Sequence, residues 1–445
     1  MRDTWLDRFA HSAGRVVPDA ITAAVLMFVV LFAGALALGN PFVKVMEAYY
    51  QGLWMLLPFT MQMTLIVVLS SVLGSSPFFR DSIQRLARIP RTANQVMAMV
   101  VLVVGAAAYF YWGLGIALGP LVCLYFAREA ERKGIAVDFL FLLGLATAAN
   151  ATWQYGFSSS APLLVATPGH FLEKTIGIIP LGRTIWSPAA IVLEIVYVSA
   201  VIALGCVLHP RSPRQLSLYP EAARILHVPE EGTPGELTES ERLERSSFAG
   251  LGLCAIMAGW LWVHFAVRGL GIDINALNTT LLLGCFAVHR SVHGFTSALR
   301  QAIATAWPVI VIYHIYACVA GLIQFTNTGE RLAGLIAAIA TPGTLPLITA
   351  LLSSVFSIFI PSSGGQWAVQ GFVVVKAAAA LGVGTERAIL SMGVGDHIGN
   401  MTSPFWYVVF AGIANVDFRS FFGYGLLFAL VWFVLGVVAF TWLPC

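Results

Sequence analysis

Four short polar stretches interrupt apolar segments of this chain, and they hold residue types that could bind a small ion. The stretches are Tyr111-Trp112-Gly113-Leu114-Gly115, Gly156-Phe157-Ser158-Ser159-Ser160, Ile360-Pro361-Ser362-Ser363-Gly364-Gly365-Gln366 and Gly395-Asp396-His397-Ile398-Gly399-Asn400-Met401-Thr402-Ser403. Proline and glycine break helices. Broken backbone inside a membrane is tolerated only where protein or a water-filled cavity satisfies its polar groups. We therefore expect the four stretches to meet around a substrate near the middle of a bilayer.

The chemistry that these stretches favour is recognition of a small carboxylate without a buried arginine. Serine hydroxyls and the N-terminal ends of broken helices attract anions, while unwound carbonyl groups can hold a cation. The candidate substrate- and ion-binding residues are Trp112, Gly113, Gly115, Ser158, Ser159, Ser160, Ser362, Ser363, Gly364, Gly365, Gln366, Asn400, Thr402 and Ser403. The aromatic residues expected to enclose a short apolar tail are Trp112, Phe157, Trp367 and Phe405. In the alternative interpretation, each break is an ordinary kink at a helix contact.

Asp396 and His397 form the clearest ionisable pair in an apolar segment. Because charge inside a membrane is costly, the pair is a candidate proton carrier or cation ligand, with Na⁺ or H⁺ as the coupling ion. The alternative is that both side chains reach water near the end of a span. Glu194 and His314 also lie in apolar segments, and for both we favour a structural role.

The composition indicates a polytopic helical membrane protein. The 445 residues are 58 % hydrophobic and 11 % charged, whereas soluble domains carry about 25 % charged residues. The net charge of +3 is too small to suggest nucleic acid as a partner. Six scattered cysteines without a C-x-x-C pair predict no disulfide and no metal cluster. No hydrolase, zinc-protease or nucleotide-binding motif is present, so we predict that the protein is not an enzyme and needs no cofactor.

The apolar runs predict an all-α fold with about nine full spans. The predicted full spans are Ala20–Leu38, Gly52–Leu73, Phe139–Thr167 (with a break), Trp186–Leu208, Phe248–Val267, Asn275–Val288, Ile303–Gln324, Ala388–Ile413 (with a break) and Phe421–Trp442. Two further segments, 94–127 and 345–381, are predicted to be re-entrant hairpins. The apolar arm Ala368–Leu381 is only ~21 Å long as a helix, too short to cross a core of ~30 Å.

The order of these elements repeats, which divides the chain into two halves. The first repeat covers 1–210, a cytoplasmic linker 211–246, an extra span 247–269 and the second repeat 270–445. Each half runs span, span, surface helix, hairpin, broken span, span. Because one repeat contributes four crossings, the extra span inverts the second half. An inverted repeat with broken helices is typical of secondary transporters.

Basic residues fit this topology when the N-terminus is cytoplasmic. Most of the 25 Lys and Arg residues then fall on predicted cytoplasmic stretches, as at Arg80, Arg128 and Arg214. The positive-inside rule expects this bias.

At these motifs the chain resembles the bacterial short-chain fatty acid transporter family, part of the ion transporter superfamily. The resemblance covers nearly the whole chain. The residues that carry it in the first half are Phe59-Thr60-Met61-Gln62-Met63, Trp112-Gly113-Leu114-Gly115, Ala127-Arg128-Glu129 and Leu163-Leu164-Val165-Ala166-Thr167-Pro168-Gly169. Those in the second half are Pro361-Ser362-Ser363-Gly364-Gly365-Gln366-Trp367, Gln370-Gly371, Asn400-Met401 and Pro404-Phe405-Trp406, and the linker run Ser240-Glu241-Arg242-Leu243-Glu244 also fits.

The resemblance implies uptake of short monocarboxylates such as acetoacetate or butyrate across the inner membrane, coupled to a cation. It also implies a scaffold domain, commonly dimeric, and a transport domain that moves as an elevator. The chain departs from the family pattern at Tyr111, where the family has Asn, and at Asp396-His397, where it has Glu-Gln. The family's Gln-Phe-Pro is missing at Tyr313–Tyr316. These departures bear on the exact substrate and coupling ion.

Two other functions stay open from the sequence. A dicarboxylate carrier or cation antiporter of the same superfamily would share the architecture. An intramembrane enzyme that acts on acyl groups would belong to a different class, although no basic partner is marked for Ser362 or Ser363.

Overall fold

The structure is a computed structural model, and it describes residues 20–226, 238–303, 306–360 and 362–444. Throughout these residues the regular structure is helical, with no strand. The predictions for Pro361 and Cys445, and for parts of the N-terminus and linker, lie outside the described residues. The all-α prediction is confirmed.

The helices of the first half follow the apolar runs and end where the sequence turns polar or meets proline. They are α2 (Ala20–Ala37), α3 (Phe42–Met55), α4 (Leu57–Gly74), α5 (Pro77–Ala87), α6 (Ala93–Phe110), α7 (Trp112–Arg132), α8 (Phe139–Ala149), the 3₁₀ helix η1 (Asn150–Tyr155), α9 (Ser160–Val165), α10 (Glu173–Ile176), η2 (Leu181–Arg183) and α11 (Pro188–Leu208). Side-chain caps at Thr92, Asp138 and Ser187 start α6, α8 and α11.

The linker and second half are helical in the same way. They comprise η3 (Leu216–Leu218), α12 (Pro220–Arg224), α13 (Glu239–Arg245), α14 (Phe248–Trp262), the π turn η4 (Val263–Val267), α15 (Ile274–His289), α16 (Val292–Ala302), α17 (Trp307–Phe325), α18 (Thr328–Ile339), α19 (Leu345–Phe359), α20 (Ser363–Ala380), α21 (Thr385–Thr402), α22 (Pro404–Ala414) and α23 (Arg419–Trp442). The described parts of the linker therefore contain short helices, and a capping box at Thr238 and Glu241 starts α13.

Six of the described helical segments are long and apolar enough to cross a membrane, or seven if the bent pair α17–α18 counts as one span. The predicted span Gly52–Leu73 belongs to a longer helical stretch, Phe42–Gly74. The beginning of this stretch is hard to recognise in the sequence because it contains the polar residues Lys44, Glu47 and Gln51. The helix nevertheless continues through them. Helices α2, α15 and α19 are also apolar, but they are too short to count among these segments.

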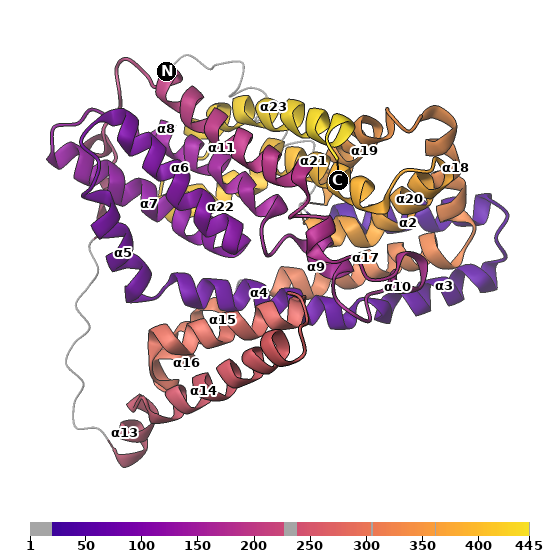
Figure 1. Ribbon diagram of the computed structural model, residues 1–445, viewed down its shortest axis with the longest axis horizontal. Helices are drawn as coiled ribbons and strands as arrows, with labels where there is room; N and C mark the ends of the chain where they lie inside the picture. The colour runs from indigo at the N-terminus through magenta and orange to yellow at the C-terminus, as the bar shows by residue number, and fades with distance from the viewer. Residues whose placement is uncertain (1–19, 227–237, 304–305, 361, 445) are drawn as a thin grey trace.

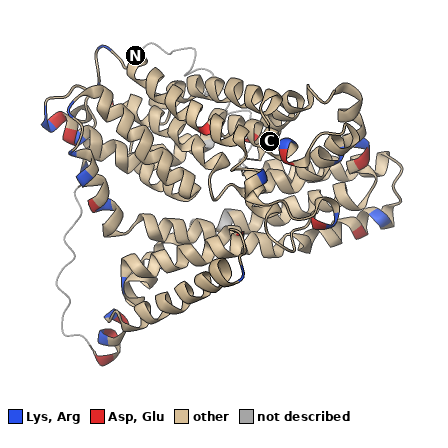
Figure 2. Cartoon of the chain, viewed as in Figure 1, with Lys and Arg blue, Asp and Glu red and all other residues tan. Residues whose placement is uncertain are grey.

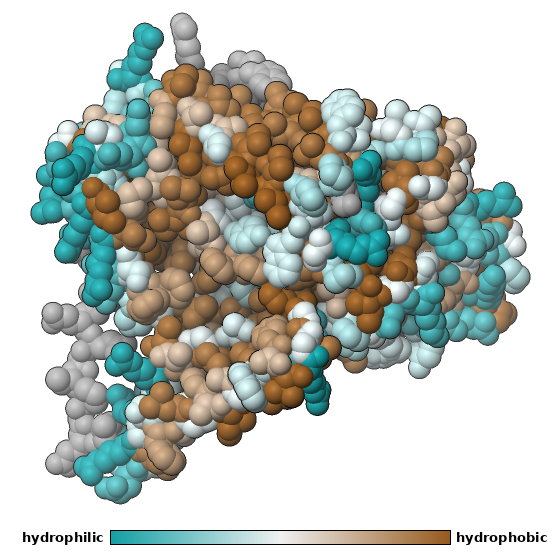
Figure 3. All heavy atoms as spheres, in the orientation of Figure 1, coloured by the Kyte–Doolittle hydropathy of each residue, from teal (hydrophilic) through white to brown (hydrophobic). Residues whose placement is uncertain are grey.

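Charge and hydropathy divide the molecule along its long axis. Figure 1 shows α13, α14, α15 and α16 as an arm beside α4, with most of the other helices bundled on the other side of α4. In Figure 2, Lys, Arg, Asp and Glu gather at the two ends of the view, near α5 and α13 at one end and near α3 and α18 at the other. The band between them is largely uncharged, and Figure 3 shows apolar side chains covering much of its surface. A chain with this distribution is suited to a lipid bilayer.

The tightest helix contact in the second half joins α19 to α21. A Cβ atom added at Gly395 would lie 1.9 Å from the Ala350 carbonyl oxygen, and one at Gly399 would lie 2.2 Å from Ser357 Cβ. Glycine is thus required at both positions for the two backbones to approach. This contact fixes α21, which carries Asp396, His397 and Asn400, against α19.

Candidate functional site

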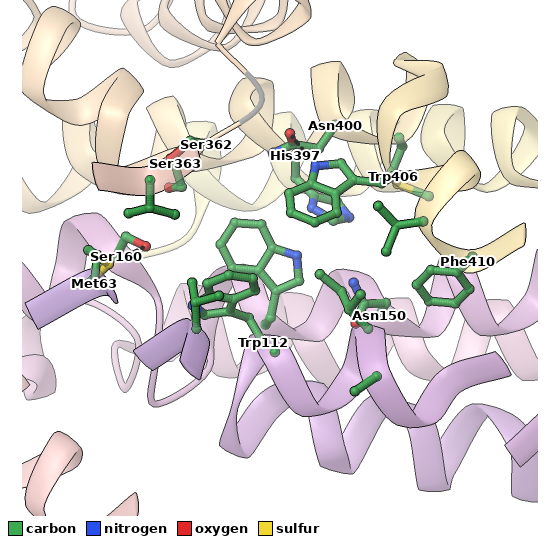
Figure 4. Close-up of a pocket in the computed structure, with 18 of the residues that line it drawn as sticks. Met63, Trp112, Asn150, Ser160, Ser362, Ser363, His397, Asn400, Trp406 and Phe410 are labelled. Carbon is green, nitrogen blue, oxygen red and sulfur yellow. Dashed lines mark hydrogen bonds between the residues drawn. The ribbon is translucent and has the colours of Figure 1, made fainter. Parts of the chain in front are cut away.

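A cavity of about 590 Å³ lies where the interrupted helices converge. Helices α4, α7 and α17 line it together with η1 and the ends of α9, α20, α21 and α22. Figure 4 shows residues from both halves of the chain facing this space, with Trp112 at its centre. Its polar lining residues are Ser71, Thr147, Asn150, Ser160, Ser362, Ser363, His397 and Asn400.

Each of the four polar stretches contributes to the lining. The first supplies Trp112 and Gly113, and the second supplies Ser160. The third supplies Ser362 and Ser363, and the fourth supplies His397, Asn400 and Met401. The structure therefore brings together residues that lie as far apart as 112 and 401 in the sequence.

Two hydrogen bonds donated by backbone N–H groups connect the first two breaks. Helix α6 ends at Tyr111 in an extended conformation, and α7 starts at once with Trp112. The Trp112 N–H, which has no partner within the new helix, donates to Ser158 Oγ at 2.9 Å. The Phe157 N–H donates to the Tyr109 carbonyl at 2.8 Å. These two bonds hold the break after η1 against the break between α6 and α7.

The third stretch is fixed by a serine cap and a tyrosine. Ser362 caps α20, because its Oγ accepts from the Gly365 N–H at 3.4 Å. The same oxygen lies 2.7 Å from the Tyr313 hydroxyl of α17. Ser363, the next residue, is buried and its Oγ has no hydrogen-bond partner. One serine therefore shapes the break while its neighbour stays available to a ligand.

The fourth stretch ends at Ser403, where α21 gives way to α22 at Pro404. Just before the break, Asn400 Oδ1 accepts from Trp406 Nε1 at 3.1 Å. The ring of Trp406 meets the ring of Trp112 edge to face, with centroids 6.3 Å apart. A pair of tryptophans, one from each half, thus lies across the cavity (Figure 4).

Two of the predicted glycines act through close packing at the cavity wall. A Cβ at Gly113 would come within 2.5 Å of Ser70, and one at Gly115 would come within 2.1 Å of Asn150 Oδ1. Gly364 and Gly365 similarly sit against the rings of Phe59 and Tyr316. Of these four glycines only Gly113 is part of the lining.

The remaining predicted polar residues stand behind the lining. Ser158 and Ser159 hold the second break, the latter by donating to the Gln154 carbonyl. Gln366 donates to the Ser353 carbonyl at 2.9 Å, and Thr402 Oγ1 donates to the Ile398 carbonyl at 2.9 Å.

The predicted tail-binding aromatics are also distributed differently from the prediction. Trp112 lines the cavity, but Trp367 is fully buried against Gly371. Phe157 packs on Phe110 and Trp186 outside the cavity. The Phe405 side chain lies outside the described atoms. The aromatic residues that do line the cavity are Trp112, Trp153, Tyr313, Tyr316, Trp406, Tyr407 and Phe410.

Asp396 and His397 point to different surroundings although they are adjacent on α21. His397 lines the cavity, and its ring packs edge to face on Trp153 and Trp432 with centroids 5.6 and 5.0 Å away. Asp396 lies off the lining and interacts with Ser363, Gln154, Ser357 and Asn400. Both side chains are buried, with 0 % and 3 % of their surface exposed, so neither reaches water at a span end.

The polar groups around the cavity are unusually poor in hydrogen bonds. Those without a hydrogen bond of normal geometry in the described structure include Trp112 Nε1, Asn150 Oδ1, Gln154 Oε1, Tyr316 Oη, Ser363 Oγ, Gln366 Oε1, Tyr407 Oη, both carboxylate oxygens of Asp396 and both ring nitrogens of His397. Asp396 has Ser363, Gln154, Ser357 and Asn400 as polar neighbours, but no hydrogen bond of normal geometry reaches its oxygens. Buried polar groups are nearly always paired, so this cluster is suited to receive ions or a polar ligand.

None of the described lining residues is Lys, Arg, Asp or Glu, and His397 is the one among them that can carry a positive charge. Most of the remaining lining is aliphatic or aromatic, as at Ile116, Val309 and Phe410. The cavity therefore combines a small polar area with a large apolar one.

Sequence reasoning missed several lining residues because their types are common in membrane helices. Asn150 and Trp153 precede the second break by a few residues, on the short 3₁₀ helix η1. Tyr313 and Tyr316 belong to α17, which has no break at that point. Proximity to a break could have signalled Asn150 and Trp406, whereas the two tyrosines stood out only because the family's Gln-Phe-Pro is missing at Tyr313–Tyr316.

Comparisons with known proteins place the chain in a family. A sequence model described as "Short chain fatty acid transporter" matches residues 5–443. An Escherichia coli K12 protein is 29 % identical over 431 residues, covering 96 % of this chain and 97 % of that protein. A Haemophilus influenzae protein is 28 % identical over 434 residues, covering 95 % of this chain and 96 % of that protein. The names of both relatives assign them to short-chain fatty acid transport.

Two solved structures share the fold. The YdaH transporter of Alcanivorax borkumensis superposes with a TM-score of 0.58 at 15 % identity, covering 95 % of this chain and 98 % of that one. MtrF of Neisseria gonorrhoeae superposes with a TM-score of 0.55 at 15 % identity, covering 98 % of this chain and 97 % of that one. With a family match over nearly the full length and apolar helices throughout, this chain belongs to the short-chain fatty acid transporter family: it is a multi-pass transporter of the bacterial inner membrane and not an enzyme.

Proposed function

We propose that this protein is a secondary active transporter that moves short-chain monocarboxylates, such as butyrate or acetoacetate, across the inner membrane. The observation that carries the proposal is the cavity, in which unpartnered donors face a mainly apolar space. Trp112 Nε1, Ser363 Oγ and the His397 ring offer hydrogen bonds to one carboxylate. Ile116, Val309 and Phe410 suit an acyl tail.

The same lining favours one negative charge over two. A dicarboxylate would bring a second charge into a space whose described lining holds no Lys or Arg. Burying an unpaired charge is costly in free energy. A monocarboxylate leaves only its apolar tail for the rest of the cavity. This argument ranks the monocarboxylate carrier above the dicarboxylate carrier.

Transport is coupled to a cation in this proposal, and Asp396 is its binding residue. A buried carboxylate without a positive partner is unstable as an anion, and a bound Na⁺ or H⁺ would remove that cost. Gln154 and Ser363 supply further oxygen atoms beside Asp396. His397, which faces the cavity, is assigned to the substrate carboxylate. The two adjacent residues therefore have separate roles in the proposal.

The architecture proposed with this function is an inverted repeat with about nine spans, a cytoplasmic N-terminus and elevator movement within a homodimer. Two matching features support the repeat: α5 precedes the pair α6–α7 as α18 precedes the pair α19–α20, and a broken helix follows each pair. At 1.5 Å per residue, α19 is ~22 Å long and α20 ~27 Å, both shorter than a ~30 Å core. The clustering of charges at two ends fits the proposed orientation (Figure 2).

Uptake of radiolabelled butyrate into proteoliposomes tests the function. We expect uptake to require an inward Na⁺ or H⁺ gradient, and to be inhibited by unlabelled acetoacetate but not by succinate. Uptake of radiolabelled succinate that unlabelled butyrate does not inhibit would instead establish the dicarboxylate carrier.

Variants test the site in the same assay. Ser363→Ala and Asn400→Ala should impair uptake, because each removes a polar group from the cavity. Ser199→Ala is the matched control, since Ser199 lies on α11 and bonds only within its own helix. Normal uptake by both cavity variants would remove Ser363 and Asn400 from the site.

A further inference from the structure

The first part of the linker folds back onto the helices that precede it. The Arg214 carbonyl accepts from the Phe139 N–H at 2.9 Å, and the Ser217 N–H donates to Glu131 Oε2 at 3.2 Å. Farther along, the Glu221 carbonyl accepts from Asn415 between α22 and α23 at 3.4 Å. A connection between two halves does not require such contacts, so this segment has a more specific role.

The centre of these contacts is Asp138, which is fully buried at the start of α8. Its Oδ1 accepts from the Phe141 N–H at 2.8 Å, which caps the helix. Its Oδ2 accepts from the backbone N–H and from Nε of Arg214 at 3.0 and 2.8 Å. Arg214 also donates to the Tyr424 hydroxyl of α23 at 2.9 Å. One linker arginine thus ties α8 to α23.

This arrangement positions part of the cavity wall. Helix α8 has 11 residues and continues directly into η1, which carries Asn150 and Trp153. A Cβ added at Gly144, in the middle of α8, would lie 2.5 Å from Tyr424 Cβ, so α8 and α23 already touch there. A shift at the start of α8 would therefore be transmitted along about three turns of helix to the cavity.

His209 completes the arrangement and makes it sensitive to protonation. It follows the last residue of α11, and its Nε2 accepts from the Asp138 backbone N–H at 3.1 Å. A nitrogen that accepts a hydrogen bond must be unprotonated, because both ring nitrogens of a charged imidazole are donors. Phe141 packs on the ring edge to face at 5.8 Å, which holds it in place.

We propose that residues 209–219, here called the linker latch, hold α8 in the position that completes the cavity, and that protonation of His209 releases them. His209, Asp138 and Arg214 are positioning residues, since none of them lines the cavity. In the orientation proposed above, the latch faces the cytoplasm, where accumulating carboxylic acid lowers the pH. Release would then slow further uptake of acid.

The charges around His209 set the direction of this dependence. Burial lowers the pKa of His209 below its usual 6.5, and the nearby Asp138 carboxylate opposes that decrease. The other titratable groups of the latch are Arg211, Arg214 and Tyr219, and Tyr424 of α23 and Glu131 of α7 lie against it. Because the latched state binds fewer protons at His209 than the released state, the latch is stable at neutral pH and is lost as the pH falls below ~6.5.

Hydrogen exchange of the backbone amides measures the latch without any substrate. In the purified full-length protein, we expect the amides of 138–142 and 213–219 to lose protection by about fivefold to tenfold between pH 7.5 and 5.5, after correction for intrinsic exchange. That factor corresponds to the loss of one or two hydrogen bonds. His209→Gln should keep its protection at pH 5.5, because the glutamine oxygen can accept from Asp138 but is not protonated in this range.

A control variant separates the latch from general effects of acid. His170→Gln removes another partly buried histidine, which bonds to the Gly177 carbonyl at 3.0 Å in a different loop. It should leave the exchange of 209–219 unchanged at both pH values. Equal loss of protection in the wild type and in His209→Gln, or no loss in the wild type, would overturn the proposal.

The effect on transport is a second, separate measurement. With the inner solution of the vesicles adjusted from pH 7.5 to 5.5, wild-type butyrate uptake should fall and His209→Gln uptake should fall less. Exchange that follows the prediction while no uptake is seen in any variant would contradict the proposed function but not the latch. Equal pH profiles of uptake in the two proteins would show that the latch does not control transport.

Discussion

Two aspartates in this molecule are equally buried and differ completely in their hydrogen bonds. Asp138 and Asp396 both expose 0 % of their surface. Asp138 accepts from Phe141 and makes three bonds with Arg214, so both of its oxygens are satisfied. The polar neighbours of Asp396 are the uncharged Ser363, Gln154, Ser357 and Asn400, and no hydrogen bond of normal geometry reaches either of its oxygens from a described residue. The protein itself supplies the hydrogen-bond partners of the Asp138 carboxylate, whereas the Asp396 carboxylate is available to a bound ion.

The difference teaches which buried charge is structural and which is functional. A carboxylate held by a helix start and an arginine stabilises the packing of the elements that supply those groups. A carboxylate without partners costs free energy in the folded state, and such groups concentrate where ions or substrates bind. The surroundings agree with this division, because Asp396 lies beside the cavity-lining Ser363 and Asn400 whereas Asp138 lies under the linker latch.

The largest effect is expected from Asp396→Asn. This change keeps the size of the side chain but removes the charge that would bind the coupling cation. Gradient-driven butyrate uptake should fall roughly 100-fold, near the upper end of coupling between two sites. The apparent melting temperature in detergent should be unchanged or higher, because an unpaired buried charge is removed. Wild-type uptake in this variant would show that the missing hydrogen bonds of Asp396 carry no function.

Arg214→Ala should have the opposite signature, a loss of stability. It leaves the Asp138 charge buried with backbone donors only. Breaking a fully buried pair costs 3–5 kcal/mol, and since the Arg214 side chain is 40 % exposed we expect about 2 kcal/mol. A thermal unfolding series in detergent measures this loss, and Arg214→Lys should recover part of it. Unchanged stability in the alanine variant would contradict the structural role of Asp138.

The sequence predicted the helical fold and the positions of the breaks well, because both depend on local residue types. Long apolar runs can only be membrane or core helices, and Pro361, Pro404 and the glycines mark where they stop. The family resemblance, carried by the motifs at Trp112–Gly115 and Pro361–Trp367, is likewise confirmed by the match over residues 5–443.

Which side of each break faces the cavity depends on tertiary packing that local patterns do not encode. Asp396 and His397 are adjacent in the sequence, yet only His397 lines the cavity. Trp367 and Trp406 are both tryptophans that follow a break, but Gly371 provides room for one ring to be buried and Asn400 holds the other across the cavity. The latch was also not predictable, since Asp138 and Arg214 are 76 residues apart.

A smaller effect is expected from Trp112→Phe, which tests whether unpartnered donors at the cavity bind substrate. Phenylalanine keeps an aromatic ring opposite Trp406 but removes Nε1, a donor that has no partner in the protein. We expect the KM for butyrate to rise about tenfold, as for loss of one hydrogen bond to a charged group, with little change in stability. Trp54→Phe is the control, because Trp54 is exposed and lies outside the lining. A KM equal to that of the wild type would exclude Trp112 Nε1 as a carboxylate ligand.

The smallest effect is expected from Glu194→Gln, and it is the sharpest test of the comparison. Like Asp396, Glu194 is buried with both carboxylate oxygens unpartnered. Unlike Asp396, it lies on α11 and no part of it lines the cavity. If missing partners mark a functional group only beside the cavity, butyrate uptake by Glu194→Gln stays within about twofold of the wild type, because glutamine keeps the shape of the side chain and position 194 lies outside the lining. A loss of uptake as large as that of Asp396→Asn would mean that burial without partners is itself the functional signal, and that α11 takes part in coupling.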